Sequence, residues 1–231
     1  MKKIVLANGI EILAEKKNVK NFNMLIKREN SFVKITYPKQ VSNLELMKFI
    51  YSKSSWIEKH AAKLNSKPIF KERLYKTGEE HYFKGLIYKL NVSYSLTRTL
   101  RINGDTMFVE IKSGDKEEHV KGVIDCFYRK ELLILVEDLV EKWEPIINVS
   151  IEESRIRKMK TLWGSCNIQK RRIWLNLQLI KHSEECIEYV VVHEMVHLLE
   201  RLHNARFHKL MDDFLPDWPA RKSRLNQGKI W

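Results

Sequence analysis

The stretch Tyr-Val-Val-Val-His-Glu-Met-Val-His-Leu-Leu, residues 189–199, places two histidines and a glutamate in an otherwise apolar segment. The pattern predicts a helix over residues 184–202, with Ser183 as its N-cap and two glutamates in its first turn. His193 and His197 are four residues apart, so their side chains leave the same helix face one turn apart. Two imidazoles at that separation can bind one divalent ion. Polar side chains buried in such a helix need partners, and a metal supplies them.

A catalytic zinc site needs a third protein ligand and one open position. We select His203, six residues beyond His197, with His208 as the reserve; Glu200 and Asp212 are the other candidates. Glu194 lies beside the two ligands, where a carboxylate can take a proton from water that the ion activates. The sequence therefore predicts one Zn²⁺ held by His193, His197 and His203, although three histidines also suit Co²⁺, Mn²⁺ or Fe²⁺.

The expected fold class is α+β. Apolar alternation predicts strands at residues 10–13, 23–26, 31–37, 81–83, 86–94, 96–102 and 106–111. Helical spacing predicts helices from the Ser42 capping box to about residue 64, over 116–142 with Pro145 closing it, and over 205–214. Residues 65–80 form a loop. Two strands, 151–162 and 173–179, are expected to pair as a hairpin around a turn at 164–167, beside the motif helix. No internal repeat is visible.

Composition indicates a folded chain. Hydrophobic residues make up 44% of the 231 residues, which excludes a disordered chain. We place a strand-rich N-terminal region with one helix at residues 1–112 and the metal-binding domain, including the long helix, at 113–231. The three cysteines are widely spaced, odd in number and contain no C-x-x-C pair, so they indicate neither a disulfide framework nor a Cys-based zinc site. The start lacks a signal-peptide pattern, and no apolar run reaches the ~18 residues of a membrane span, so we expect a cytoplasmic protein.

Several residues near the motif admit two interpretations. Trp174 and Asn176 are our candidates for substrate binding, although packing on a paired strand and a hydrogen bond that closes the strand end explain them as well. Cys166 could be a metal or redox residue, but we expect a small buried residue in the hairpin turn. The net charge of +13 permits nucleic acid or nucleotide binding through a basic surface, and the cluster Arg155, Arg157, Lys158 and Lys160 is either such a surface or a solvated face.

Five motifs in register resemble the YgjP-like metallopeptidase family, which is related to the SprT-like (Spartan-type) proteases. They are KMKTLWGSC (158–166), IWLN (173–176), YVVVHEMVHL (189–198), HNARF (203–207) and PDW (216–218). The resemblance implies a zincin-like metallopeptidase fold in the C-terminal half, with His193, His197 and His203 as ligands and Glu194 as the catalytic base. Leu162 and His208 depart from the family pattern, which usually has Arg and Trp there.

Three functions are therefore open. The leading one is a zinc-dependent metallopeptidase that hydrolyses peptide bonds with metal-activated water and a glutamate general base. The second is a metal-dependent nucleoside triphosphate phosphohydrolase, an activity also ascribed to YgjP-like proteins; no glycine-rich phosphate loop supports it. The third is a DNA-associated protease of the SprT-like kind, although no helix-turn-helix or zinc-finger pattern is present.

Overall fold

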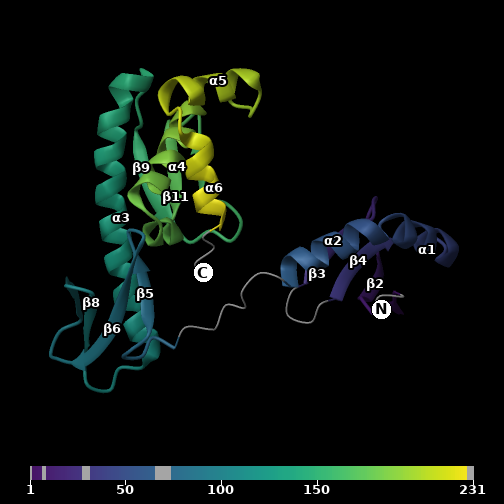
Figure 1. Ribbon diagram of the computed structural model, residues 1–231, viewed down its shortest axis with the longest axis horizontal. Helices are drawn as coiled ribbons and strands as arrows, with labels where there is room; N and C mark the ends of the chain where they lie inside the picture. The colour runs from purple at the N-terminus through teal and green to yellow at the C-terminus, as the bar shows by residue number, and fades with distance from the viewer. Residues whose placement is uncertain (1, 7–8, 28–31, 66–73, 228–231) are drawn as a thin grey trace. The chain divides into compact units, whose positions relative to one another are not determined.

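The computed structural model describes residues 2–6, 9–27, 32–65 and 74–227 (Figure 1). Its fold is α+β, as expected. The chain divides into two compact units, Met1–Lys71 and Glu72–Trp231, each with its own hydrophobic core. The boundary that we expected between residues 112 and 113 lies inside the second unit, where the flanking strand and helix share one core.

The first unit is a four-stranded sheet covered by helices. Its elements are β1 (Lys2–Val5), β2 (Glu11–Lys17), β3 (Asn23–Lys27), β4 (Phe32–Pro38), α1 (Asn43–Ser52) and α2 (Ser54–Asn65). The strand order is β1-β2-β4-β3. Ile12 and Ile35 on the sheet pack with Ile50 and Ile57 on the helices, and all four are fully buried. Strand β1 was not predicted.

The single helix expected from Ser42 to residue 64 is two helices, which corrects the prediction. The capping box is confirmed: Glu45 N–H donates to the Ser42 hydroxyl at 3.2 Å, and Ser42 N–H donates to the Glu45 carboxylate at 2.8 Å. Helix α1 ends at Ser52, and the N–H of its C-cap Lys53 bonds back to the Ile50 carbonyl in a tight turn. No glycine or proline marks this break, so the sequence pattern did not reveal it.

The second unit begins with another four-stranded sheet, β5 (Glu80–Phe83), β6 (Leu86–Tyr94), β7 (Thr99–Asn103) and β8 (Thr106–Ile111), in the order β5-β6-β8-β7. The expected strands are confirmed, except that β7 starts three residues late. The predicted loop at 65–80 falls partly on residues 66–73, which lie outside the described residues.

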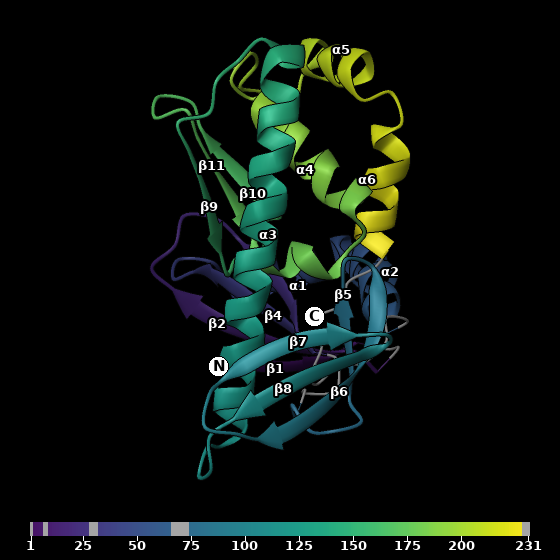
Figure 2. The same ribbon diagram turned by 90° about the vertical axis from the view of Figure 1, so that its left-hand side faces the viewer.

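The long helix α3 (Glu117–Ile147) continues past its predicted end at residue 142. Pro145 does not close it; the helix ends at Asn148, whose left-handed backbone (φ 57°) turns the chain away. Pro145 sits in the last turn, and buried Trp143 and Ile147 hold that turn against the core. Figure 2 shows α3 running from the β5–β8 sheet along the rest of the unit.

A second sheet beside α3 has the order β10-β11-β9, from β9 (Glu153–Arg157), β10 (Gly164–Asn167) and β11 (Arg172–Asn176). The predicted hairpin between 151–162 and 173–179 is wrong, because β9 and β11 run parallel. The expected turn at 164–167 is itself the strand that pairs antiparallel with β11. Residues 177–181 leave the sheet as the 3₁₀ helix η1 (Leu177–Lys181), where the Asn176 side chain accepts the Gln178 N–H.

The remaining helices are α4 (Glu184–Val196), α5 (Ala205–Phe214), as predicted, and α6 (Trp218–Gln227), which was not predicted. Helix α4 ends six residues before the predicted residue 202, because the chain turns sharply after His197. Glu188 joins three helices: its carboxylate accepts from Lys142 Nζ at 2.7 Å, Trp143 Nε1 at 3.0 Å and Arg221 Nη1 at 2.6 Å. Among the described residues, no helix has the length and apolar character needed to cross a bilayer.

Candidate active site

Helix α4 carries the central residues of the site on its last turns. The helix is apolar and fully buried at Val191, Val192 and Val196, so its position against the sheet of β10 and β11 is fixed by packing. His193 lies within the helix and His197 is its C-cap. Their ring centroids are 4.9 Å apart, which agrees with the one-turn spacing predicted from the sequence.

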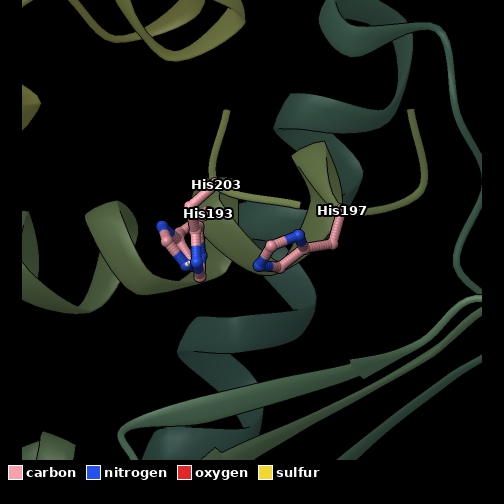
Figure 3. A group of neighbouring side chains, drawn as sticks. All are labelled: His193, His197 and His203. Atoms are coloured by element: carbon pink, nitrogen blue, oxygen red, sulfur yellow. Dashed lines mark hydrogen bonds between the residues drawn. The ribbon is translucent and has the colours of Figure 1, made fainter. Parts of the chain in front are cut away.

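His203 reaches the other two histidines from the loop between α4 and α5. Its Nε2 lies 3.0 Å from Nε2 of His193, and its ring centroid lies 4.7 Å from that of His197. One nitrogen from each of the three rings falls within 4.8 Å of the others, and Figure 3 shows the rings facing one another. Among the residues described, this is the group of His, Cys, Asp and Glu side chains with metal-binding spacing.

The surroundings of the three rings favour a metal ion over ordinary hydrogen bonds. His197 Nδ1 lies 3.0 Å from the Glu200 carbonyl oxygen, which holds the ring and leaves Nε2 directed toward the other histidines. Buried Phe207 packs its ring 4.8–4.9 Å from all three imidazoles and forms an apolar floor. Burial, followed by the neighbouring histidines, lowers the pKa of His193 to about 3. A neutral imidazole is the form that binds a metal.

Glu194 is almost completely buried, with 5% of its surface exposed. Burial raises the pKa of its carboxyl to about 8. The carboxylate lies against Gly164 on β10: a Cβ on that glycine would stand 2.6 Å from Glu194 Oε1 and 2.8 Å from its Cγ. Such distances are sterically forbidden, so glycine is required at position 164 for Glu194 to occupy this place.

The three histidines and Glu194 open into a cleft of about 1050 Å³. β10 and the residues that flank it, 161–169, line this cleft, together with Phe207 and His208 of α5 and Trp218 and Lys222 of α6. Glu194 is the single carboxylate among the lining residues, whereas Arg201 and Lys222 bring two cations. The cleft is therefore cationic at its rim.

Trp218 and Lys222 are residues that our sequence analysis missed. The Trp218 ring stacks on His208 at 5.7 Å and on Tyr189 at 6.3 Å, and its Nε1 donates to Asp212 at 2.8 Å. Lys222 Nζ lies 5.3 Å from the Trp218 ring centroid. The available signal was Trp218 in the PDW motif, but α6 itself was not predicted.

Of the other candidate ligands, His208, Glu200 and Asp212 stay outside the histidine group. His208 stacks on Trp218, the Glu200 carbonyl accepts from His197, and Asp212 accepts from Trp218. Cys166 is a half-buried residue of the cleft wall on β10. Burial, with the nearby Glu194 charge, raises the pKa of its thiol to about 11.

Trp174 and Asn176, the predicted substrate-binding residues, do not line the cleft. Asn176 is buried; its amide Nδ2 donates to the carbonyls of Met159 and Leu162 at 2.9 Å each. Trp174 is half-buried, with the Arg157 guanidinium 3.6 Å and the Arg172 guanidinium 4.8 Å from its ring centroid. Asn176 thus holds the segment that leads into β10.

A buried carboxylate next to three converging imidazoles is the arrangement of a metal-dependent hydrolase. Comparison with known proteins gives the family: the model of the YgjP-like metallopeptidase domain matches residues 20–228, so the chain belongs to the YgjP-like metallopeptidase family. No curated protein matches the chain.

Two solved structures are similar over part of the chain. The metallopeptidase zymogen of Pyrococcus abyssi abylysin is 23% identical with a TM-score of 0.38, over 41% of this chain and 94% of that one. The metallopeptidase zymogen of Methanocaldococcus jannaschii jannalysin is 20% identical with a TM-score of 0.37, over 41% of this chain and 97% of that one.

Proposed function

We propose that this protein is a zinc-dependent metallopeptidase with a zincin-like catalytic half. His193, His197 and His203 hold one zinc ion, and Glu194 is the general base. The observation that carries the proposal is the convergence of three imidazole nitrogens within 4.8 Å of one another, next to a glutamate that is 5% exposed. Zinc is preferred because neutral imidazoles in a histidine-glutamate motif of this spacing suit it.

The ion supplies Lewis acidity, which lowers the pKa of water and polarises a carbonyl. Glu194 accepts the proton from the attacking water and passes it to the amine that leaves when the peptide bond breaks. A carboxyl with its pKa raised to about 8 by burial can both accept and release a proton near neutral pH. Gly164 keeps the carboxylate in place, and Phe207 excludes water from the other side of the rings.

Protein or peptide substrates fit the cleft through its strand wall. β10 pairs with β11 on one side and forms the edge of its sheet, and its residues line the cleft. An extended peptide can add to such an edge by main-chain hydrogen bonds, which places a backbone carbonyl near the histidines. Direct substrate contact by Trp174 stays a prediction, whereas Asn176 acts by holding residues 159–162.

Substitution of Glu194 by Gln tests the mechanism. We expect E194Q to retain stoichiometric zinc and to lower turnover of a denatured protein substrate by about a thousandfold, because the amide cannot accept the proton. H203A loses the metal, and H208A, whose ring lies outside the group, retains it; elemental analysis of the purified variants measures this. Full activity in E194Q would disprove the assigned base.

Nucleotide hydrolysis is the second candidate, and the observation that favours it is the pair of rim cations, Arg201 and Lys222. Lysine and arginine at the mouth of a metal site can bind a triphosphate. A panel of nucleoside triphosphates tested beside a panel of denatured proteins separates the two activities. Phosphate release that depends on Lys222, without peptide cleavage, would replace the peptidase proposal.

A further inference from the structure

The two four-stranded sheets have one topology. In the first, β1 pairs antiparallel with β2, β2 pairs parallel with β4, and β4 pairs antiparallel with β3. In the second, β5, β6, β8 and β7 repeat these relations in the same order. In both, a helix follows the fourth strand, α1 after β4 and α3 after β8. We call residues 2–52 the first module and residues 80–126 the second module.

The modules also match residue by residue from the fourth strand into the helix. The buried positions of the two recur at one constant separation: Val33 and Met107, Ile35 and Val109, Tyr37 and Ile111, Leu46 and Val120, Ile50 and Ile124. The helix N-caps Ser42 and Lys116 match at the same separation. Ile50 and Ile124 are the one identical pair in this set, which explains why no repeat was visible in the sequence. The structure corrects that prediction.

The second module is a structural part of the catalytic unit. Its helix continues as α3, which shares a core with α4, and the Lys84 N–H donates to the Ile180 carbonyl at 2.7 Å. Gly85 in its first turn would bring a Cβ within 3.1 Å of the Ser183 backbone, so this turn lies tightly against the start of α4. The first module instead closes its own core with Ile57 of α2 and belongs to a separate compact unit.

Charge separates the two modules. Residues 1–71 contain 15 Lys and Arg against 5 Asp and Glu, so they carry +10 of the net +13. The first module itself has 10 basic and 4 acidic residues, whereas the second has 7 of each. The second module has the same fold and no net charge, whereas the first module is strongly basic. The fold therefore does not require the positive charge. This charge points to an anionic partner.

The helices of the first unit show where such a partner binds. Lys48, Lys53 and Lys59 are exposed on α1, at its cap and on α2, and within the described parts of the chain no carboxylate forms an ion pair with them. Two exposed aromatic residues lie between these lysines in the sequence: Tyr51 is 64% exposed, and Trp56 is 42% exposed although it stacks on His60 with ring centroids 3.9 Å apart. Lysines beside exposed rings provide contacts for phosphates and stacking surfaces for unpaired bases.

We propose that the first module is a duplicated copy of the module that supports the catalytic helix, and that the unit containing it, residues 1–71, binds single-stranded nucleic acid through the α1–α2 surface formed by Lys48, Tyr51, Lys53, Trp56 and Lys59. A lipid surface fits less well. The apolar faces of α1 and α2, with Leu46, Ile50 and Ile57, are already buried against their own sheet. Of the large aliphatic side chains described on these helices, Leu44 is the one that is exposed, at 67%, which is too little to insert into a bilayer.

The test is binding of a fluorescein-labelled 20-nucleotide single strand to the full-length protein, followed by fluorescence anisotropy across a salt series. The triple variant K48Q/K53Q/K59Q removes three phosphate contacts, so the slope of log affinity against log salt becomes shallower by about 2. W56A weakens binding about tenfold at every salt concentration, because stacking does not depend on counterion release.

The matched control is K112Q/K130Q/K209Q, which removes three exposed lysines from the second unit and the same total charge. Circular dichroism confirms that each variant is folded. Equal loss of binding in the control and the test variant would show that net charge alone attracts the strand and would overturn the assigned surface. A second result would also overturn the proposal: no binding to the oligonucleotide, together with binding to vesicles of anionic lipid that W56A weakens. Neither outcome bears on peptide hydrolysis, which is measured separately.

Discussion

Glu194 and Gly164 depend on each other across two elements. The carboxylate occupies the volume where any larger residue at position 164 would place its Cβ. A buried carboxyl without such room would have to adopt another rotamer, and a displacement of about 1 Å at a catalytic group can cost a hundredfold in rate. Gly164 is therefore a positioning residue for the proposed base.

Replacement of Gly164 by Ala tests this dependence. We expect G164A to bind zinc with the stoichiometry of the parent, because the three histidines are untouched, and to lose about a hundredfold in kcat. Gly122→Ala on α3 is the control, since a Cβ there meets no atom within 4 Å. Steady-state kinetics with one peptide and elemental analysis give the two readouts. Parent-like kcat in G164A would show that Glu194 does not act from its observed position.

Among single residues, the sequence predicted those whose function follows from their spacing along one helix. His193, Glu194 and His197 follow from helical geometry, and His203 from the need for a third ligand. Gly164, Trp218 and Lys222 could not be assigned in this way, because their roles arise from contacts between segments that are distant in the sequence. Asn176 was named, but its partners are backbone carbonyls, which no side-chain pattern reveals.

A buried histidine lies at the junction of two secondary-structure elements, η1 and α4. His182 is 4% exposed and meets the edge of the Trp163 ring, with centroids 5.0 Å apart. Burial, with the nearby Lys181 charge as the smaller cause, lowers the pKa of His182 from 6.5 to about 4. A histidine whose pKa is lower in the folded state binds its proton more readily after unfolding.

Acid should therefore weaken the folded state through His182. Its contribution to the free energy of unfolding is complete above pH 6.5 and is lost as the pH falls toward about 4, by about 3 kcal/mol at most. Denaturant titrations at several pH values, on the parent and on H182Q, measure this. The variant should show a shallower decline over that range. If the free energy of unfolding falls equally with pH in the parent and in H182Q, groups other than His182 cause the acid sensitivity.

The element predictions succeeded where local signals were strong and failed where pairing decided the structure. The capping box placed the start of α1 correctly, and the amphipathic pattern placed α5. The short run Gly164–Asn167 reads as a turn by its composition, but the parallel pairing of β9 with β11 leaves a free edge on β11 that β10 fills. A parallel pair depends on contacts between distant residues, so alternation in the sequence does not specify it.

For the whole molecule, the two modules show how one topology serves two purposes. The second module is continuous with the catalytic core, whereas the first has a core of its own. Hydrophobic burial keeps the fold while identities change, because any apolar residue of suitable size fills each matched position. The repeat is therefore a property of the structure that the amino-acid letters do not display.

Separate cores predict separate unfolding transitions. Ile50 and Ile124 occupy the matched helix position in the two modules, and each is at most 2% exposed. Truncation to Ala should cost about 2–5 kcal/mol in either place, but I50A should lower the transition of residues 1–71 and I124A that of residues 72–231. Removal of zinc by a chelator should lower the second transition alone, because a ligand stabilises only the unit that binds it. Scanning calorimetry of the full chain measures the two unfolding transitions. A single transition that I50A, I124A and the chelator all lower equally would mean that the two units unfold as one cooperative body.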